Sequence, residues 1–82
     1  MSVNLSFEPD FTGVNQVFGL GERWALSIIE RFTDTEGHLP PEEVSKVAQA
    51  MSRHEDATEE EKRLYKAFLE ASAQGSWLMV RC

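Results

Sequence analysis

Five carboxylates crowd into seven consecutive positions of this sequence, and they are its densest group of side chains that could do chemistry. They are Glu55, Asp56, Glu59, Glu60 and Glu61. Paired carboxylates can serve as general acid and base when burial raises the pKa of one of them. The stretch SRHEDATEEEKR that carries them is almost wholly polar, so nothing indicates such burial. The group therefore predicts a charged surface and not a catalytic pair.

The remaining reactive side chains are two histidines and one cysteine. His38 and His54 fall in separate loops, and neither has a set of cysteines or carboxylates at the spacing of a metal site. Cys82 is the single cysteine, so an internal disulfide framework is excluded. Because it lies at the terminus, it is not expected to form a nucleophile–base pair with a histidine. We therefore expect a protein that is not an enzyme and that has no catalytic residue, metal ligand or cofactor.

The stretch ERFTDTEGHLPPEEV resembles a degenerate EF-hand. Placing Gly37 at the sixth position of the calcium loop puts Asp34 at the third position and Glu43 at the twelfth. The first position then falls on Phe32, which has no oxygen to offer a cation. Calcium takes about six to eight oxygen ligands, and the first carboxylate is one of the main ones. We expect a helix–loop–helix turn without calcium binding.

Both ends of the sequence are expected to form β-strands. In SVNLSFEP, Val3, Leu5 and Phe7 alternate with polar residues, which is the period of a half-buried strand that Pro9 ends. SWLMV, at residues 76–80, is a short apolar run and a second candidate strand. Because a lone strand has no hydrogen-bonding partner, the two terminal strands are candidates to pair with each other.

Three helices are predicted between these strands, because apolar residues recur there at i, i+3, i+4 and i+7. The first begins near residue 20, the second at the Pro40–Pro41 pair, and the third after Thr58, where Glu61 completes a capping box. Gly75 is placed to end the third helix. The apolar stripes are Ala25, Ile28, Ile29 and Phe32; Val44, Val47, Ala48 and Met51; and Leu64, Ala67, Phe68 and Ala71.

These elements predict an α+β fold, a compact three-helix unit with short N- and C-terminal strands. The chain has 82 residues, of which 41% are hydrophobic, so we expect a single small acidic domain over residues 1–82. No basic leader and no apolar run of ~18 residues is visible, so neither a signal peptide nor a membrane span is expected. The single cysteine fits the reducing cytoplasm.

The acidic charge is concentrated in one third of the chain. Residues 34–61 hold nine acidic and two basic residues, a net charge of −7, whereas the rest holds five acidic and six basic residues. One explanation is local, because acids in the first turn of a helix stabilise its dipole. The other is an acidic surface for a basic partner. If the second and third helices pack antiparallel, their acidic first turns lie at opposite ends and form two patches.

The aromatic residues are core residues by default, among them Trp24, Tyr65, Phe68 and Trp77. Trp77 is nevertheless the best candidate for an exposed anchor, because SWLMV is apolar on both faces. Exposed tryptophans often dominate the binding energy of an interface.

The net charge of −6 argues against direct binding to nucleic acid or to an anionic membrane, since both attract basic proteins. We expect instead a cytoplasmic binding protein that occupies a basic surface of a larger protein. The partner's surface could be one that binds nucleic acid. Carboxylates at i and i+4 of a helix lie ~6 Å apart, which is loosely comparable to the spacing of phosphates, so the acids could mimic a nucleic-acid backbone. The residues expected to make the contact are Glu55, Asp56, Glu59, Glu60 and Trp77.

In size and charge alone, the chain is similar to small acidic inhibitors encoded by phages and other mobile elements, such as anti-CRISPR proteins. No motif supports this analogy, and it implies only an inhibitory mode of binding. The alternative is a homodimeric structural or regulatory module, in which two copies pair their strands or helices across a twofold axis.

Overall fold

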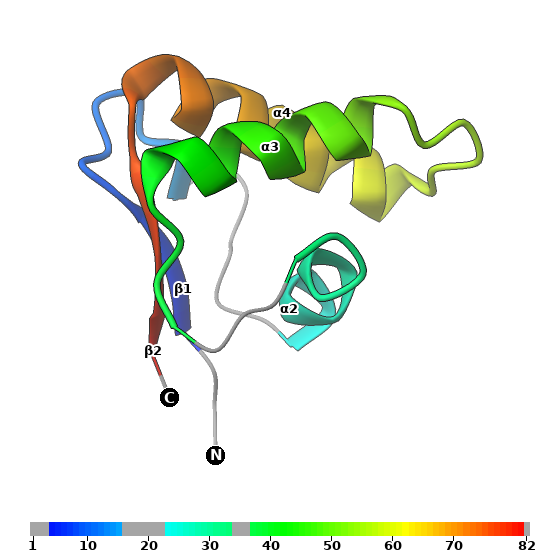
Figure 1. The fold of residues 1–82 in the computed structure, drawn as a ribbon, viewed down its shortest axis with the longest axis horizontal. Coiled ribbons are helices and arrows are strands. Elements are labelled where there is room, and N and C mark those ends of the chain that lie inside the picture. The colour runs from blue at the N-terminus through cyan, green and yellow to red at the C-terminus, as the bar shows by residue number, and fades with distance from the viewer. Residues whose placement is uncertain (1–3, 16–22, 34–36, 82) are drawn as a thin grey trace.

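The two ends of the chain pair as an antiparallel sheet in the computed structural model, which describes residues 4–15, 23–33 and 37–81 (Figure 1). Strand β1 (Asn4–Glu8) runs against strand β2 (Trp77–Arg81). Leu5 lies opposite Val80, and Phe7 lies opposite Leu78. The predicted terminal strands are therefore confirmed, and they are each other's partners.

The outer edge of β2 is covered by the segment that precedes the second predicted helix. Leu39 and Leu78 exchange two backbone hydrogen bonds, at 2.8 and 2.9 Å. Two residues further along β2, the backbone N–H of Val80 donates to Nδ1 of the His38 side chain at 3.0 Å. His38 was expected to be a solvated loop residue, and it is exposed, but its ring also completes the edge of the sheet.

The outer edge of β1 is closed by a side chain. The amide of Asn15 accepts from the backbone N–H of Phe7 and donates to its carbonyl, both at 2.8 Å, as a neighbouring strand would. Asp10 holds Asn15 in place, because its carboxylate accepts from the backbone N–H groups of Val14 at 2.8 Å and of Asn15 at 3.3 Å. Unpaired strand edges invite association with other chains, and at this position the edge is satisfied internally.

Within the described residues, helices α2 (Arg23–Ile29), α3 (Pro41–Ser52) and α4 (Glu59–Gln74) lie between the strands. The start expected for the first helix, near residue 20, lies outside the described residues. Helix α2 ends at Ile29, three residues before the end of its predicted stripe, and Phe32 lies in the turn that follows. Helix α3 begins with proline at its first position, as predicted.

The ends of α4 follow the predicted capping chemistry. The hydroxyl of Thr58 accepts from the backbone N–H of Glu61 at 3.2 Å and donates to its carboxylate at 3.3 Å. At the other end Gly75 adopts a left-handed conformation with φ of 70°, which favours glycine. Its backbone N–H donates to the carbonyls of Ala71 and Ser72 and so closes the last turn. A side chain at this position would be strained by the backbone conformation.

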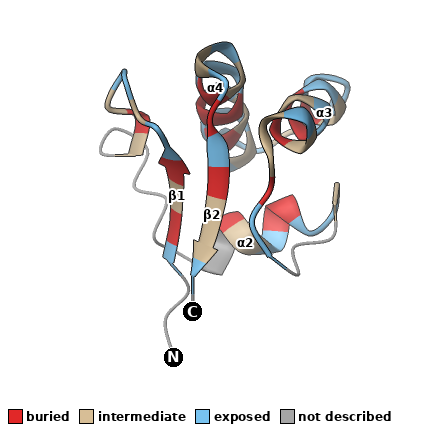
Figure 2. Ribbon diagram, turned by 60° about the vertical axis from the view of Figure 1, so that its left-hand side comes forward, coloured by how far each residue is buried: buried red, intermediate tan, exposed pale blue. Residues whose placement is uncertain are grey.

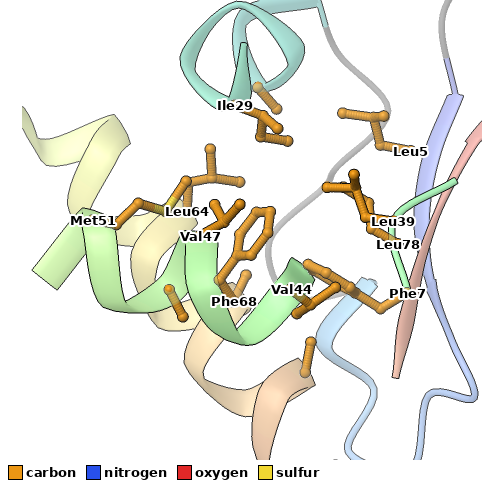
Figure 3. Packing of buried hydrophobic residues seen from close by; sticks show 14 of the residues in the cluster. Leu5, Phe7, Ile29, Leu39, Val44, Val47, Met51, Leu64, Phe68 and Leu78 are labelled. Carbon is orange, nitrogen blue, oxygen red and sulfur yellow. The ribbon is translucent and has the colours of Figure 1, made fainter. Parts of the chain in front are cut away.

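All three helices pack on one face of the sheet and enclose a single core (Figures 1 and 3). Helices α3 and α4 form an antiparallel hairpin, and α2 lies beneath it (Figure 1). Phe7 and Phe68 meet edge to face with ring centroids 5.2 Å apart, so the sheet and the hairpin share one contact at the centre. The core residues are Leu5, Phe7, Val14, Ala25, Ile28, Ile29, Leu39, Val44, Val47, Ala48, Met51, Leu64, Ala67, Phe68, Ala71 and Leu78.

The predicted α+β fold is thus confirmed, and the predicted stripes of α3 and α4 are buried throughout (Figure 2). Among the aromatic residues expected in the core, Phe68 is buried and Tyr65 is partly buried. Trp77 departs from that default, because it is 46% exposed on the outer face of β2. The side chain of Trp24 lies outside the described residues. No helix in the described part of the chain is long and apolar enough to cross a membrane.

Candidate interaction site

The loop between α3 and α4 carries the first two acids of the predicted site. Helix α3 is closed by backbone hydrogen bonds from Arg53 to the Ala50 carbonyl at 3.2 Å and from His54 to the Met51 carbonyl at 3.1 Å. The chain then turns at Glu55 and Asp56, in the loop that joins α3 to α4 at the end of the hairpin (Figure 1), and both residues are exposed.

The first turn of α4 adds Glu59 and Glu60, which are also exposed. Glu59 contacts Lys62 with 3.8 Å between the carboxylate and the ammonium, a loose surface pair. The structure therefore places four predicted site residues at one end of the helical hairpin, and we refer to Glu55, Asp56, Glu59 and Glu60 as the acidic tip.

Trp77 lies at the opposite end of the molecule from the acidic tip. Helix α4 has 16 residues and is therefore ~24 Å long, and Trp77 follows its C-terminus (Figure 1). Its neighbour across the sheet is Glu8. The structure does not bring this tryptophan together with the predicted acids, so one small contact cannot include both.

A second acidic region lies at the start of α3, as expected for antiparallel helices. Glu42 is exposed there. Glu43 is engaged by its own neighbours, because it accepts from the hydroxyl of Thr33 at 3.4 Å and lies 3.5 Å from the ammonium of Lys46. Two other acids of this region, Asp34 and Glu36, lie outside the described residues.

Glu61 differs from the other acids of its segment because its side chain is only 12% exposed. Its carboxylate lies 3.2 Å from Nδ1 of His54 and 3.6 Å from the guanidinium of Arg31. The turn after α2 brings Arg31 within reach, through backbone hydrogen bonds to the last residues of that helix. Glu61 therefore joins α2, the α3–α4 loop and α4.

The sequence predicts His54 in a loop and gives no sign of this cluster. The His54 ring is also packed against Phe32, edge to face, with ring centroids 6.3 Å apart. No local pattern indicates these contacts, because Phe32, His54 and Glu61 belong to segments that meet only in the folded chain. The capping motif was visible in the sequence, but the second role of its glutamate was not.

A small pocket opens beside the cluster, with a volume of about 180 Å³. Apolar and aromatic side chains line much of it, and polar groups surround them. Glu55 of the acidic tip belongs to this lining. The lining residues are Ile28, Phe32, Met51, Ser52, His54, Glu55, Ala57, Glu61, Lys62 and Tyr65.

The pocket contains part of a hydrolytic arrangement, since Glu61 contacts His54 as the acid of a triad contacts its base. The hydroxyl that lines the same pocket belongs to Ser52, and it donates to the carbonyl of Gln49 at 2.6 Å. It is therefore engaged with its own helix and is not shown to be activated by His54. Among the described residues, no three His, Cys, Asp or Glu side chains converge as a metal site.

The chain was compared with protein families, curated proteins and solved structures. No protein-family model, curated protein or solved structure matches the chain.

Proposed function

We propose that this chain is a small, acidic, non-enzymatic binding protein of the cytoplasm that occupies a basic surface of a larger protein partner. The acidic tip makes the first contact. Its carboxylates attract the partner over a distance and raise the association rate. A basic surface that binds nucleic acid is the expected target, so that occupation would inhibit the partner.

The observation that carries this proposal is that the fold makes little use of the tip charges. Thr58 caps α4 with its hydroxyl, and the largely buried side chain of Glu61 makes the internal ion pairs. Within the described residues, Glu55, Asp56 and Glu60 have no ion-pair partner. First-turn acids do stabilise the helix dipole, but only by about 0.3–1 kcal/mol each, and that effect does not apply to Glu55 and Asp56 in the loop.

Charge reversal with a position-matched control tests the proposal. The variant Asp56→Lys/Glu60→Lys changes the acidic tip, and Glu42→Lys/Glu70→Lys makes the same change in net charge at exposed sites elsewhere. Glu42, like Glu60, lies in the first turn of its helix, so the dipole cost is matched as well. Proteins captured from the native host by each variant are compared by mass spectrometry.

We expect a protein that is captured by the unmodified chain and by the control variant, and that is lost with the tip variant. Circular dichroism confirms that both variants are folded. Capture of the same proteins by the folded tip variant as by the control would contradict the proposal.

A second candidate function, homodimerisation, is favoured by the exposed aromatic residues at the other end of the molecule. Trp77 is 46% exposed, and Phe11, in the loop after β1, is 77% exposed. The two are held near each other, since the backbone N–H of Phe11 donates to the side chain of Gln74 at the end of α4. Pairing of two copies through this end would bury both aromatic residues of each copy.

Light scattering after size-exclusion chromatography tests this candidate. A dimer predicts twice the chain mass of 9.3 kDa at micromolar concentration, and a return to the monomer mass in Trp77→Ser. The control is Leu69→Ser, which removes an exposed apolar side chain from α4. A monomer mass at all concentrations tested would exclude a homodimeric module.

A further inference from the structure

The size of the pocket beside Glu61 limits what it can hold. Its volume of about 180 Å³ corresponds to roughly six water molecules. Pockets that enclose a drug-sized ligand or a cofactor measure about 300–1,000 Å³. A single amino-acid side chain is therefore the class of ligand that the space suits, and a protein partner can supply one.

The lining combines aliphatic side chains with flat rings. Ile28 and Met51 offer aliphatic surface, whereas Phe32, Tyr65 and His54 offer rings. A long side chain with an aliphatic stem and a planar end fits such a mixture, because the stem packs on the aliphatic residues and the end stacks on a ring.

The charged groups that face the pocket are the carboxylates of Glu55 and Glu61 and the ammonium of Lys62. Glu61 is already shared between His54 and Arg31, and the ammonium of Lys62 lies 3.8 Å from Glu59. Glu55 also lines the pocket, and it has no ion-pair partner within the described part of the chain. It is therefore the carboxylate that is available to an incoming positive charge, and the other acids of the tip add to the attraction.

We propose that the pocket binds an arginine side chain of the basic partner, with the guanidinium held by Glu55 and stacked on the rings. Arginine is favoured over lysine because its planar guanidinium stacks on aromatic faces and pairs with a carboxylate through two hydrogen bonds. The chain's own Arg31 also makes an ion pair at this cluster, with its guanidinium 3.6 Å from the carboxylate of Glu61. This inference rests on the proposed function, and it moves the anchor from Trp77 to the acidic end of the hairpin.

The pocket is tested without the partner, by nuclear magnetic resonance titration of the full chain with short peptides. The four peptides are acetyl-Gly-Gly-X-Gly-Gly-amide, in which X is arginine, lysine, norleucine or phenylalanine. We expect saturable shifts of Phe32, Met51, His54 and Tyr65 with the arginine peptide, and binding weaker by about tenfold for the other three. Equal or tighter binding of the norleucine or phenylalanine peptide would show an apolar pocket without a preference for arginine, and would overturn the assignment.

Variants show whether the shifts report this pocket. Ala57→Leu and Ser52→Leu fill it from two sides without changing charge, and Ala73→Leu is the control on an exposed position near the far end of α4. Either filling variant, if folded, should weaken binding of the arginine peptide by about tenfold, while the control should not. Glu55→Gln should weaken binding of the arginine peptide and leave binding of the norleucine peptide unchanged. Binding that is unaffected by both filling variants and by Glu55→Gln would refute the proposal.

Failure of this inference is distinguishable from failure of the proposed function. If the arginine peptide does not bind, but a captured partner is still lost with Asp56→Lys/Glu60→Lys, the acidic tip acts by steering alone. If the peptide binds and no protein depends on the tip for capture, the pocket exists and the proposed function is wrong.

Discussion

Nδ1 of His54 lies 3.2 Å from the carboxylate of Glu61, a residue seven positions further along the chain. This contact fastens the α3–α4 loop to the first turn of α4. The same carboxylate contacts Arg31 from the turn after α2, at 3.6 Å. Glu61 thus holds three parts of the fold together, whereas the four carboxylates of the acidic tip remain exposed to solvent.

Replacing Glu61 by glutamine should therefore cost more stability than the same change in its neighbour. Glu61→Gln weakens the pairs with His54 and Arg31, and because both partners are partly exposed we expect a loss of ~0.5–1.5 kcal/mol in the free energy of unfolding. Glu60→Gln is the control and should change stability by less than about 0.5 kcal/mol. Urea unfolding of the two variants measures the difference. Equal stability of the two variants would mean that the cluster does not contribute to folding.

Phe68 lies at the centre of the core and should be among the costliest residues to truncate. It is fully buried and meets Phe7 edge to face, so Phe68→Ala removes contacts from both the sheet and the hairpin. We expect a loss of ~3–5 kcal/mol, which would unfold much of the population of so small a domain. The matched change Leu69→Ala, one position on and 44% exposed, should cost less than about 1 kcal/mol. Thermal melts followed by circular dichroism report both values.

The charges of the acidic tip should raise the rate of association with a partner through long-range attraction. The helix cap at Thr58 should not affect this rate. The association rate of Asp56→Lys/Glu60→Lys should fall below that of the unmodified chain at low salt. The two rates should converge at high salt, because the Debye length shrinks from ~10 Å at about 0.1 M to ~3 Å at about 1 M. Stopped-flow or surface-based kinetics with a captured partner measure this.

Thr58→Ala provides the contrast for that experiment. It removes the hydroxyl that caps α4, so it should cost about 1 kcal/mol of stability without changing the charge. Its association rate should equal that of the unmodified chain at both salt concentrations. A rate lowered as much as in the charge-reversed variant would indicate that helix integrity, and not charge, controls binding.

Calcium should have no effect on the protein. The resemblance to an EF-hand lacks the first ligand, at Phe32, and Glu43 is engaged by Thr33 and Lys46. Titration to millimolar calcium should leave the tryptophan fluorescence and the melting temperature unchanged. A saturable change that disappears in Glu43→Gln would revive the calcium site.

The sequence by itself was sufficient to predict both strands and helices α3 and α4. The apolar stripes at helical spacing identified α3 and α4, and the stripe of α4 from Leu64 to Ala71 is buried as predicted. Thr58 and Gly75 marked the ends of α4. Alternation of Leu5 and Phe7 identified β1. These features depend on residues within a turn or two of one another, and such local rules can be read along the chain.

Only the tertiary structure decided which side chains meet. The side-chain amide of Asn15 closes a strand eight positions earlier in the chain, and Trp77 faces outward because the inner face of its strand is taken by Leu78. The pocket joins Phe32, Met51 and Tyr65 across three segments. Such contacts have no periodicity, because they are produced when the hairpin and α2 pack on the sheet. The acids could therefore be found in the sequence, whereas only the folded chain separates Glu61, which supports the fold, from the acids that stay exposed.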